Sequence, residues 1–440
     1  MPSDARLAAY LVLRRTFEQG AFTDRAFHAA AVGLRGRDRA LAMRLAYGSV
    51  QRALTLDQLI ERASGRPVAK LDAPLLAALR LGAYELCFAG NAQHAVVNDA
   101  VELAKGFHGQ GLVNAVLRRL AREGADMLAG LRDEDPRAAS VRHSMPLWIV
   151  ELWWEALGAQ GARALLARTN EPAENSLRAN TLRTDAVSLA ASLRADGVAA
   201  EAVGDPPEAV VVSGGFDAHG SAPWRAGELM PQSRASMLVA HCVNPSGGER
   251  VLDLCAAPGG KTTHLAALMG GGGEIVAVER HAGRARALQR TAERMGVGDV
   301  SVEIADATAP RRGGERFARV LLDAPCSGLG TLQSRPDLRW RATPEAVREL
   351  AAQQARLLSA AAAACAPGAT LVYSTCTISP AENERQIEAF LDEHPEFAPI
   401  DLQSRHPGWA HPHAPDQLLA LGHIQGSDGF FVAAMARERD

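Results

Sequence analysis

The sequence predicts a multidomain fold, in which an all-α domain is followed by a small α+β module and then by a doubly wound α/β domain. Three observations predict this order. The chain has 440 residues, more than one ordinary hydrophobic core holds. Residues 5–125 show helical periodicity with few strand signals. From residue 232 onward, short apolar runs alternate with helical segments, as buried parallel strands and their crossover helices do. We therefore expect domains at 1–140, 145–231 and 232–440.

Composition and charge favour a soluble globular protein. The chain is 47% hydrophobic and 22% charged, and it has no apolar run of about eighteen residues. Its first residues lack the pattern of a signal peptide, so we expect a cytoplasmic protein. The six cysteines form no C-x-x-C pair, which indicates neither a zinc site nor a disulfide framework. Residues 1–144 hold 20 Lys and Arg against 15 Asp and Glu, which reflects either contact with a polyanion or ordinary fluctuation of surface charge.

Five amphipathic segments predict the helices of the first domain. Glycines at 65, 90, 106 and 124 punctuate the pattern. The segments read ARLAAYLVLRRTF, RDRALAMRLAYGSVQRAL, LDAPLLAALRLGAYELCFA, HAVVNDAVELAKGF and GLVNAVLRRLARE. The stretch 130–145 is polar and contains a proline, so we expect a linker there.

The middle of the chain mixes strand and helix signals. Residues 175–183 alternate like a strand, and 208–214 are rich in β-branched residues. Between them, 185–198 has helical periodicity that ends at Gly197. This pattern predicts a small α+β module.

Five apolar runs predict the parallel strands of the last domain. They lie at 250–254, 274–279, 300–304, 318–323 and 369–374. A long helix is expected between the last two, with Thr343 as its N-cap and Gly368 just past its end. Because ligands of such sheets bind beyond the carboxyl ends of the strands, polar residues at those ends are the candidates for a site.

The first strand runs into the glycine turn DLCAAPGGKTTH, residues 253–264. The turn is not a P-loop, because Cys255 occupies the position of the first glycine, and it does not have the G-x-G-x-x-G spacing of a dinucleotide site. Only three of the 47 basic residues are lysine, so we expect Lys261 to be required as a compact ammonium group.

The acids that follow the next strands indicate which cofactor the turn holds. Glu279 ends the second strand and can accept from two ribose hydroxyls, while Asp306 follows the third and can accept from an adenine amino group. Lys261 can meet a carboxylate, and no cluster of cations is available for phosphates. S-adenosylmethionine therefore fits the pattern better than NAD or ATP.

Two cysteines, Cys326 and Cys376, end what should be neighbouring strands. Burial as small hydrophobic side chains explains Cys87 and Cys365 well, but it explains cysteines in polar loops poorly. Beside a methyl donor, a thiolate that adds to C6 of a pyrimidine turns C5 into a nucleophile. Asp323 could keep or share a proton and hydrogen-bond N3 of the base. Spacing alone does not say which cysteine attacks.

These motifs resemble a known family, the Nol1/Nop2/Sun family of RNA cytosine-C5 methyltransferases. The resemblance rests on DLCAAPGGKTTHLA, VLLDAPCSGLGTL, RPDLRW, YSTCTISPAENE and GSDGFFVA. In the first domain, RLGAYEL, HAVVNDAVELAK and GLVNAVLRRL resemble the NusB-like helical domain of a bacterial branch that acts on small-subunit (16S) ribosomal RNA. The resemblance implies a NusB-like domain, an RRM-like module and a Rossmann-like class I methyltransferase domain that uses S-adenosyl-L-methionine.

The resemblance also implies roles for individual residues. Cys376 would be the nucleophile, and Cys326 would assist release of the methylated base. The cofactor contacts implied are Cys255, Ala256, Ala257, Pro258, Gly259, Gly260, Lys261, Glu279, Asp306 and Asp323. The RNA contacts implied are Arg178, Asn180 and Arg335. The chain departs from the family at Gln333 and Ser334, where arginines are common, and at Ser233, where an acid is usual.

The expected partner is small-subunit ribosomal RNA, with no metal and no membrane, and the expected state is a monomer. Two alternatives stay open. The same chemistry could act on tRNA or large-subunit rRNA, because appended domains and RNA shape choose the target. The chain could instead be a non-catalytic RNA-binding factor. In the catalytic case the base must leave its stack to admit a thiol at C6, so a loop or junction is the expected target.

Overall fold

The computed structural model describes residues 2–309 and 314–439. The chain divides into two compact units. The first runs to Pro172 and also takes in Leu332–Arg341, and the second takes in Ala173–Thr331 and the chain from Ala342 onward. The segment Leu332–Arg341 therefore belongs to the first unit, although the residues on both sides of it belong to the second.

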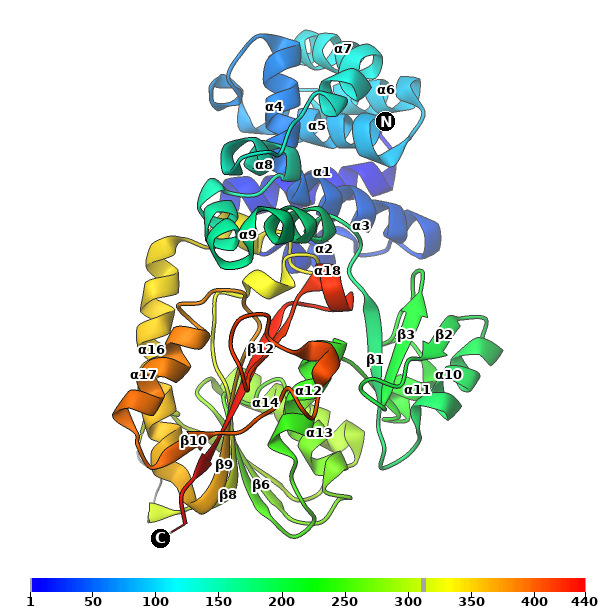
Figure 1. Ribbon diagram of the computed structural model, residues 1–440. Helices are drawn as coiled ribbons and strands as arrows, with labels where there is room; N and C mark the ends of the chain where they lie inside the picture. The colour runs from blue at the N-terminus through cyan, green and yellow to red at the C-terminus, as the bar shows by residue number, and fades with distance from the viewer. Residues whose placement is uncertain (1, 310–313, 440) are drawn as a thin grey trace. The chain divides into compact units, whose positions relative to one another are not determined.

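The first unit is built from helices (Figure 1), and this confirms the predicted all-α domain. Its α-helices are α1 (Asp4–Gln19), α2 (Thr23–Ala30), α3 (Gly36–Gln51), α4 (Ala53–Ser64), α5 (Ala73–Tyr84), α6 (Gln93–Leu103), α7 (Gln110–Ala129), α8 (Pro136–His143), α9 (Leu147–Thr169) and α15 (Leu338–Arg341). A 3₁₀ turn η1 (Val68–Lys70) and a π-helical turn η2 (Glu85–Ala89) complete the unit.

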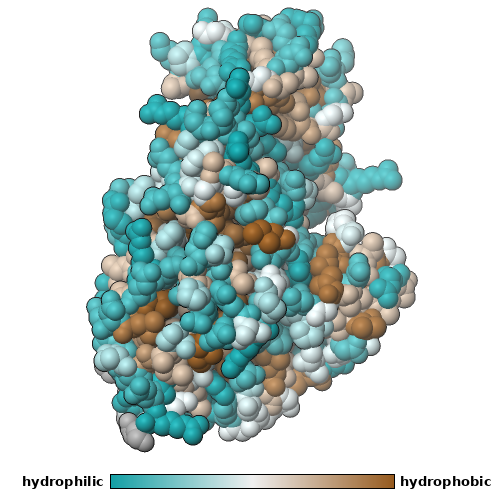
Figure 2. Space-filling model, in the orientation of Figure 1, coloured by the Kyte–Doolittle hydropathy of each residue, from teal (hydrophilic) through white to brown (hydrophobic). Residues whose placement is uncertain are grey.

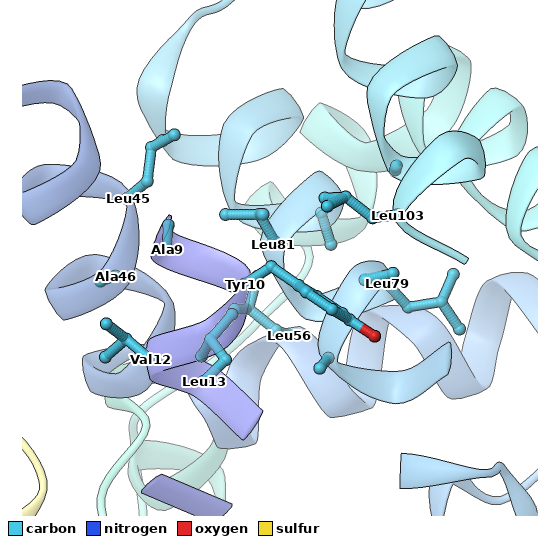
Figure 3. Packing of buried hydrophobic residues seen from close by; sticks show 14 of the residues in the cluster. Ala9, Tyr10, Val12, Leu13, Leu45, Ala46, Leu56, Leu79, Leu81 and Leu103 are labelled. Atoms are coloured by element: carbon cyan, nitrogen blue, oxygen red, sulfur yellow. The ribbon is translucent and has the colours of Figure 1, made fainter. Parts of the chain in front are cut away.

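Burial of apolar faces holds these helices together. Figure 3 shows Tyr10, Val12 and Leu13 of α1 packed among side chains of the neighbouring helices. Ala5, Ala9 and Leu13 are four residues apart and all buried, so they form one stripe along α1. Each large side chain buried in this way contributes about 1.5–3 kcal/mol to stability.

The prediction of a linker at 130–145 was wrong, because helix α8 lies within it. Asp135 caps this helix, and its Oδ1 accepts from the backbone N–H groups of Arg137 and Ala138 at 2.9 Å each. Pro136 stands at the first helical position, where its missing N–H costs nothing. Acidic residues and a proline are common in loops, but in this order they start a helix.

The second unit begins with the small α+β module, which confirms that prediction. Its elements are β1 (Asn175–Ala179), α10 (Ala186–Ala195), β2 (Ala199–Ala202), β3 (Ala209–Ser213), α11 (Ala222–Arg225) and β4 (Leu229–Pro231). The sheet order is β2-β3-β1-β4, and the neighbouring strands are antiparallel. This βαββαβ arrangement is ferredoxin-like. The short strands β2 and β4 were not predicted, because β2 reads AAEA and lacks β-branched residues.

The rest of the second unit is the predicted α/β domain. Its strands are β5 (Arg250–Leu254), β6 (Glu274–Glu279), β7 (Val300–Ile304), β8 (Phe317–Asp323), β9 (Cys365–Thr375), β10 (Phe397–Pro399), β11 (Leu418–Ala420) and β12 (Phe430–Arg437). The sheet order is β10-β12-β9-β8-β5-β6-β7, and β11 pairs with β12. All five predicted strands are parallel neighbours in this sheet. The antiparallel part made by β10, β11 and β12 was not predicted.

Helices cover both faces of this sheet. In Figure 1, α16 (Pro344–Ala364) and α17 (Glu384–Glu393) lie together on one side of the strands. On the other side lie α12 (Arg234–Val243), α13 (Gly260–Leu268) and α14 (Ala282–Met295). The short elements are η4 (Leu329–Thr331), η5 (Pro407–Trp409) and α18 (Gly422–Gln425). The site at the strand ends is therefore carried by a rigid layered scaffold.

The surface is mostly polar. On the face shown in Figure 2, hydrophobic residues form small separate patches among hydrophilic ones. Among the described residues, no helix combines the length and the apolar character needed to cross a bilayer.

Candidate active site

The predicted site residues gather at the carboxyl edge of the parallel strands. The strand register aligns Leu254 of β5 with Val278 of β6 and with Leu322 of β8. It also aligns Asp323 of β8 with Ser374 of β9. Because parallel strands end at the same edge of a sheet, the residues that follow them lie along one border. These are Cys255, Glu279, Asp306, Asp323, Cys326 and Cys376.

The glycine turn connects β5 to α13 and approaches its neighbours closely. Gly259 has φ +98°, and a Cβ there would lie 3.2 Å from Leu288 Cγ and 3.4 Å from Thr291 Cβ. Its N–H donates to Ala256 O at 2.9 Å, which closes the turn. Helix α13 begins at the next residue, so its first backbone N–H groups have no partner within the helix. The turn therefore presents backbone N–H donors, and a side chain at position 259 would press against α14.

Lys261, Asp323 and Ser374 form a hydrogen-bonded group at the centre of the edge. Lys261 Nζ donates to Asp323 Oδ2 at 2.8 Å, and Ser374 Oγ donates to Asp323 Oδ1 at 2.9 Å. The ammonium group also lies 4.8 Å from the centre of the Phe430 ring. Lys261 thus meets a carboxylate of the protein itself, and its contact with a cofactor stays a prediction.

Asp253 lies beneath the turn and is completely buried. Its Oδ2 accepts from Thr262 Oγ1 at 2.6 Å, while Oδ1 has no hydrogen-bond partner among the described residues. Burial raises the pKa of Asp253 to about 7. A buried carboxyl oxygen without a donor is costly in a finished fold, so it marks a place where a polar ligand group fits.

The two acids after β6 and β7 differ in burial. Glu279 is buried, and its Oε1 accepts from His281 N at 2.8 Å while Oε2 lies 3.3 Å from Arg284 Nε. Asp306 is exposed, and its Oδ1 accepts from the N–H and hydroxyl of Thr308. These hydrogen bonds lower the pKa of Asp306. Glu279 ends β6 and Asp306 follows β7, and their contacts with a ribose and a base stay predictions.

The structure brings the two predicted cysteines together. Cys326 Sγ and Cys376 Sγ are 3.3 Å apart. Its hydrogen bond with Cys376, together with burial, holds the pKa of Cys326 well above its ordinary value. A raised pKa favours the protonated thiol, which suits a proton donor better than a nucleophile.

The other four cysteines do not form such a pair. Cys242 and Cys365 are buried, and burial raises the pKa of Cys365 to about 12 and that of Cys242 further. Burial raises the pKa of Cys87 to about 11. Cys255, in the glycine turn, has a pKa raised to about 12, mainly by burial. None of these thiols is set up as a nucleophile.

Two of the predicted RNA contacts, Arg178 and Asn180, are buried in the second unit. Arg178 donates to Gly260 O at 2.8 Å and to Thr263 Oγ1 at 2.9 Å. Asn180 Nδ2 donates to Gly227 O and Met295 O at 2.8 and 2.9 Å. These side chains hold the small module against α13 and α14, and their contact with RNA stays a prediction.

Gln333, Ser334 and Arg335 belong to the first unit, and Ser233 belongs to the second. Arg335 is exposed, and its contact with RNA stays a prediction. Gln333 Nε2 lies within hydrogen-bond distance of three carbonyl oxygens at the end of α9, at 3.0–3.3 Å. Glutamine therefore anchors this segment, where arginine is common in the family. Ser233 stands at the N-cap of α12 without a side-chain capping bond.

One group of side chains has the composition of a metal site. Glu208, His241 and His264 bring their ligand atoms within 4.8 Å of one another. Burial disfavours the Glu208 carboxylate, but hydrogen bonds from the two histidines outweigh it and lower its pKa. Burial lowers the pKa of His264 to about 3, and Arg178 adds to this effect. The positive charge of Arg178 offsets the negative charge of Glu208. The group therefore serves as a polar contact between the small module and helices α12 and α13.

Sequence reasoning missed a set of buried polar residues behind the cysteines. Glu382 and Asn383 are 0% and 1% exposed, and Gln354 of α16 is also buried. In sequence, Glu382 and Asn383 lie within the motif YSTCTISPAENE, where sequence reasoning assigned them no role. Only the contacts in the folded chain distinguish them.

The chain matches three family models. The model described as 16S rRNA methyltransferase RsmB/F matches residues 240–436. The NusB family model matches residues 3–122, and the model of the RsmF/B-like ferredoxin-like domain matches residues 145–219.

Known proteins resemble the chain over nearly its whole length. A Synechocystis protein named probable ribosomal RNA small subunit methyltransferase B is 37% identical, and the match covers 98% of this chain and 99% of the relative. A Thermus thermophilus protein named ribosomal RNA small subunit methyltransferase B is 37% identical over 91% of this chain and 89% of its own. The crystal structure of a protein named PH0851 has a TM-score of 0.83 and 27% identity, and covers 99% of both chains.

Proposed function

The chain belongs to the 16S rRNA methyltransferase RsmB/F family, and from this premise we propose that it methylates C5 of a cytosine in small-subunit ribosomal RNA. Membership makes it a ribosomal RNA methyltransferase. The observation that carries the cytosine-C5 chemistry is the pair of thiols, Cys326 and Cys376, 3.3 Å apart after adjacent strands. A methyl transfer to an oxygen or an amino nitrogen has no use for two thiols.

The reaction uses the two thiols in turn. The Cys376 thiolate forms a bond to C6, and the electron pair of the C5=C6 bond moves to C5. A protonated Asp323 would donate a hydrogen bond to N3 of the base and so offset the negative charge that builds up during addition. When bound, S-adenosylmethionine would supply an electrophilic methyl group for C5 and leave as S-adenosylhomocysteine. Loss of the C5 proton to a base then re-forms the C5=C6 bond and expels Cys376. Cys326, whose raised pKa favours the protonated thiol, assists this release by donating to the departing thiolate.

The residues present fit S-adenosylmethionine. The unpartnered Oδ1 of Asp253 and the first backbone N–H groups of α13 both lie at the turn expected to hold the amino-acid part. Glu279 would hold the ribose hydroxyls, and Asp306 would hold the adenine amino group. The remaining contacts proposed are Cys255, Ala256, Ala257, Pro258, Gly260, Lys261 and Asp323.

The other domains would select the RNA. We assign RNA binding to the helical domain at 1–140 and to the module at 145–231, and catalysis to 232–440. Contacts through Arg178, Asn180 and Arg335 are part of this proposal, as is action by a monomer. A thiol reaches C6 only of an unstacked base, so the target is a loop or junction nucleotide.

Bisulfite sequencing of total RNA from cells with and without the gene tests the proposal. We expect one cytosine of small-subunit rRNA to lose its resistance to conversion when the gene is deleted. The wild-type gene should restore resistance, and the Cys376→Ala gene should not. Loss of resistance in tRNA or large-subunit rRNA instead would contradict the assigned substrate, and no change anywhere would contradict the chemistry.

A further inference from the structure

Two adjacent buried residues, Glu382 and Asn383, connect the loops that carry the two cysteines. They lie between β9 and α17. Both side chains are buried, so neither bonds to solvent. Their hydrogen bonds go instead to the residues on either side of each cysteine.

Glu382 binds the residue that follows each cysteine. Its Oε1 accepts from Ser327 N at 2.8 Å, and its Oε2 accepts from Ser327 Oγ at 2.5 Å. The same Oε2 accepts from Thr377 Oγ1 at 3.3 Å, and the two hydroxyls are 2.8 Å apart. One carboxyl group therefore ties Ser327, next to Cys326, to Thr377, next to Cys376.

Asn383 and Gln354 bind the residues that precede the two cysteines. Asn383 Oδ1 accepts from Thr375 Oγ1 at 2.6 Å, and Asn383 Nδ2 donates to Thr377 O at 3.1 Å. Gln354 Nε2 donates to Pro325 O at 2.9 Å and lies 3.2 Å from Glu382 Oε1. Each cysteine is thus fixed on both sides.

The cost of this arrangement indicates a function. Glu382 is fully buried, and no cation forms an ion pair with it in the part of the chain that the structure describes. A buried carboxyl group that has only neutral donors is destabilising compared with an apolar side chain of similar size. Such groups are retained where they hold reacting groups in position.

We propose that Glu382 and Asn383 are positioning residues that set the separation and direction of the Cys326 and Cys376 thiols. This inference rests on the proposed function, because it assigns the geometry needed for addition to C6 and for release. A displacement of about 1 Å at a reacting atom costs roughly 100-fold in rate. The pair acts through the two loops, and its loss is expected to lower kcat rather than raise KM for RNA.

Three variants of the full chain test the proposal. Glu382→Ala removes the connection. Glu382→Gln keeps one acceptor for Ser327 N and gains a donor for Ser327 Oγ, so it should behave like the wild type. Thr375→Val removes one bond to Asn383 with little change in volume, and it tests the idea if the alanine variant fails to fold. Glu388→Ala, on the exposed side of α17, is the matched control.

Two measurements separate geometry from activity. The first is the rate at which diamide, a thiol oxidant, joins Cys326 to Cys376, read by peptide mass as a loss of two hydrogens. This measurement needs no RNA. We expect wild type, Glu382→Gln and Glu388→Ala to react alike, and Glu382→Ala to react about 10-fold more slowly because its thiols are no longer held together. The second is methyl transfer to small-subunit rRNA, where kcat should fall about 100-fold in Glu382→Ala and about 10-fold in Thr375→Val, with KM unchanged.

The outcomes distinguish the two claims. If folded Glu382→Ala and Thr375→Val oxidise and methylate at the wild-type rate, the positioning role is wrong while the proposed function stands. If oxidation slows as expected but wild type methylates no cytosine, the positioning role stands and the proposed function fails. If Glu382→Gln is as slow as Glu382→Ala in both assays, the charge of Glu382 matters more than its hydrogen bonds, and the proposal is overturned in its present form.

Discussion

Substitution of Gly259 by alanine tests whether the glycine turn is the cofactor site. Gly259 has φ +98°, and an added Cβ would contact Leu288 Cγ at 3.2 Å and Thr291 Cβ at 3.4 Å. A residue with a Cβ costs about 1–2 kcal/mol in the left-handed region, before any contact is strained. If the turn shifts to relieve this cost, the affinity for S-adenosylmethionine should fall by roughly 5- to 30-fold.

Isothermal titration calorimetry with S-adenosylmethionine measures that affinity, and chemical denaturation measures the free energy of unfolding. Gly283→Ala is the matched control, because this glycine lies in α14 with open space around it. That variant should bind normally and gain about 0.4–1 kcal/mol in stability. Normal cofactor affinity and normal stability in Gly259→Ala would refute the reasoning, since the strain must appear in one of the two.

Three further predictions concern buried polar groups. Burial raises the pKa of Asp253 to about 7 in the folded chain, so its carboxyl group takes up a proton on folding between about pH 4 and pH 7. The free energy of unfolding of the wild type should therefore fall as pH rises through this range, by at most about 1.4 kcal/mol per pH unit. Asp253→Asn should flatten this dependence in denaturation curves, and an unchanged slope would contradict it. Arg339→Ala should lower the free energy of unfolding by about 3 kcal/mol and expose Leu332–Arg341 to proteases, because Arg339 donates to Ser144 O, Gln51 O and Asn170 Oδ1. Arg335→Ala, at an exposed position, should have neither effect. Glu208→Ala should lower the free energy of unfolding by about 3–5 kcal/mol, because it removes the partner of two histidines and the negative charge that offsets buried Arg178. A loss below about 1 kcal/mol would contradict the assigned contact.

The sequence predicts the parallel part of the α/β domain because its signal is local. Buried strands such as β6 and β8 are nearly continuous apolar runs, and their order along the chain places their ends at one edge. The juxtaposition of Cys326 and Cys376 follows from this order alone. The antiparallel strand β12 was missed, because Phe430–Arg437 pairs with β9 from more than 50 residues away, and no local pattern encodes that pairing.

Side-chain partners were harder to predict than positions. The sequence places Lys261 and Asp323 at adjacent strand ends, but it does not show that they bond to each other. The resemblance implied an RNA contact for Arg178, and the sequence did not show that this side chain is buried and donates to Gly260 O. Glu382 has the composition of a surface residue and is fully buried. In each case the partner lies far away in sequence, so that composition and periodicity carry no information about it.

The central claim is that Cys376 forms a bond to the base and that Cys326 is needed to break it. The most direct measurement incubates Cys326→Ala protein with S-adenosylmethionine and small-subunit rRNA, and then separates the products on a denaturing gel. We expect a covalent protein–RNA band with Cys326→Ala and none with Cys376→Ala or with the double variant. A band that persists in Cys376→Ala, or normal turnover of Cys326→Ala without any band, would contradict the account.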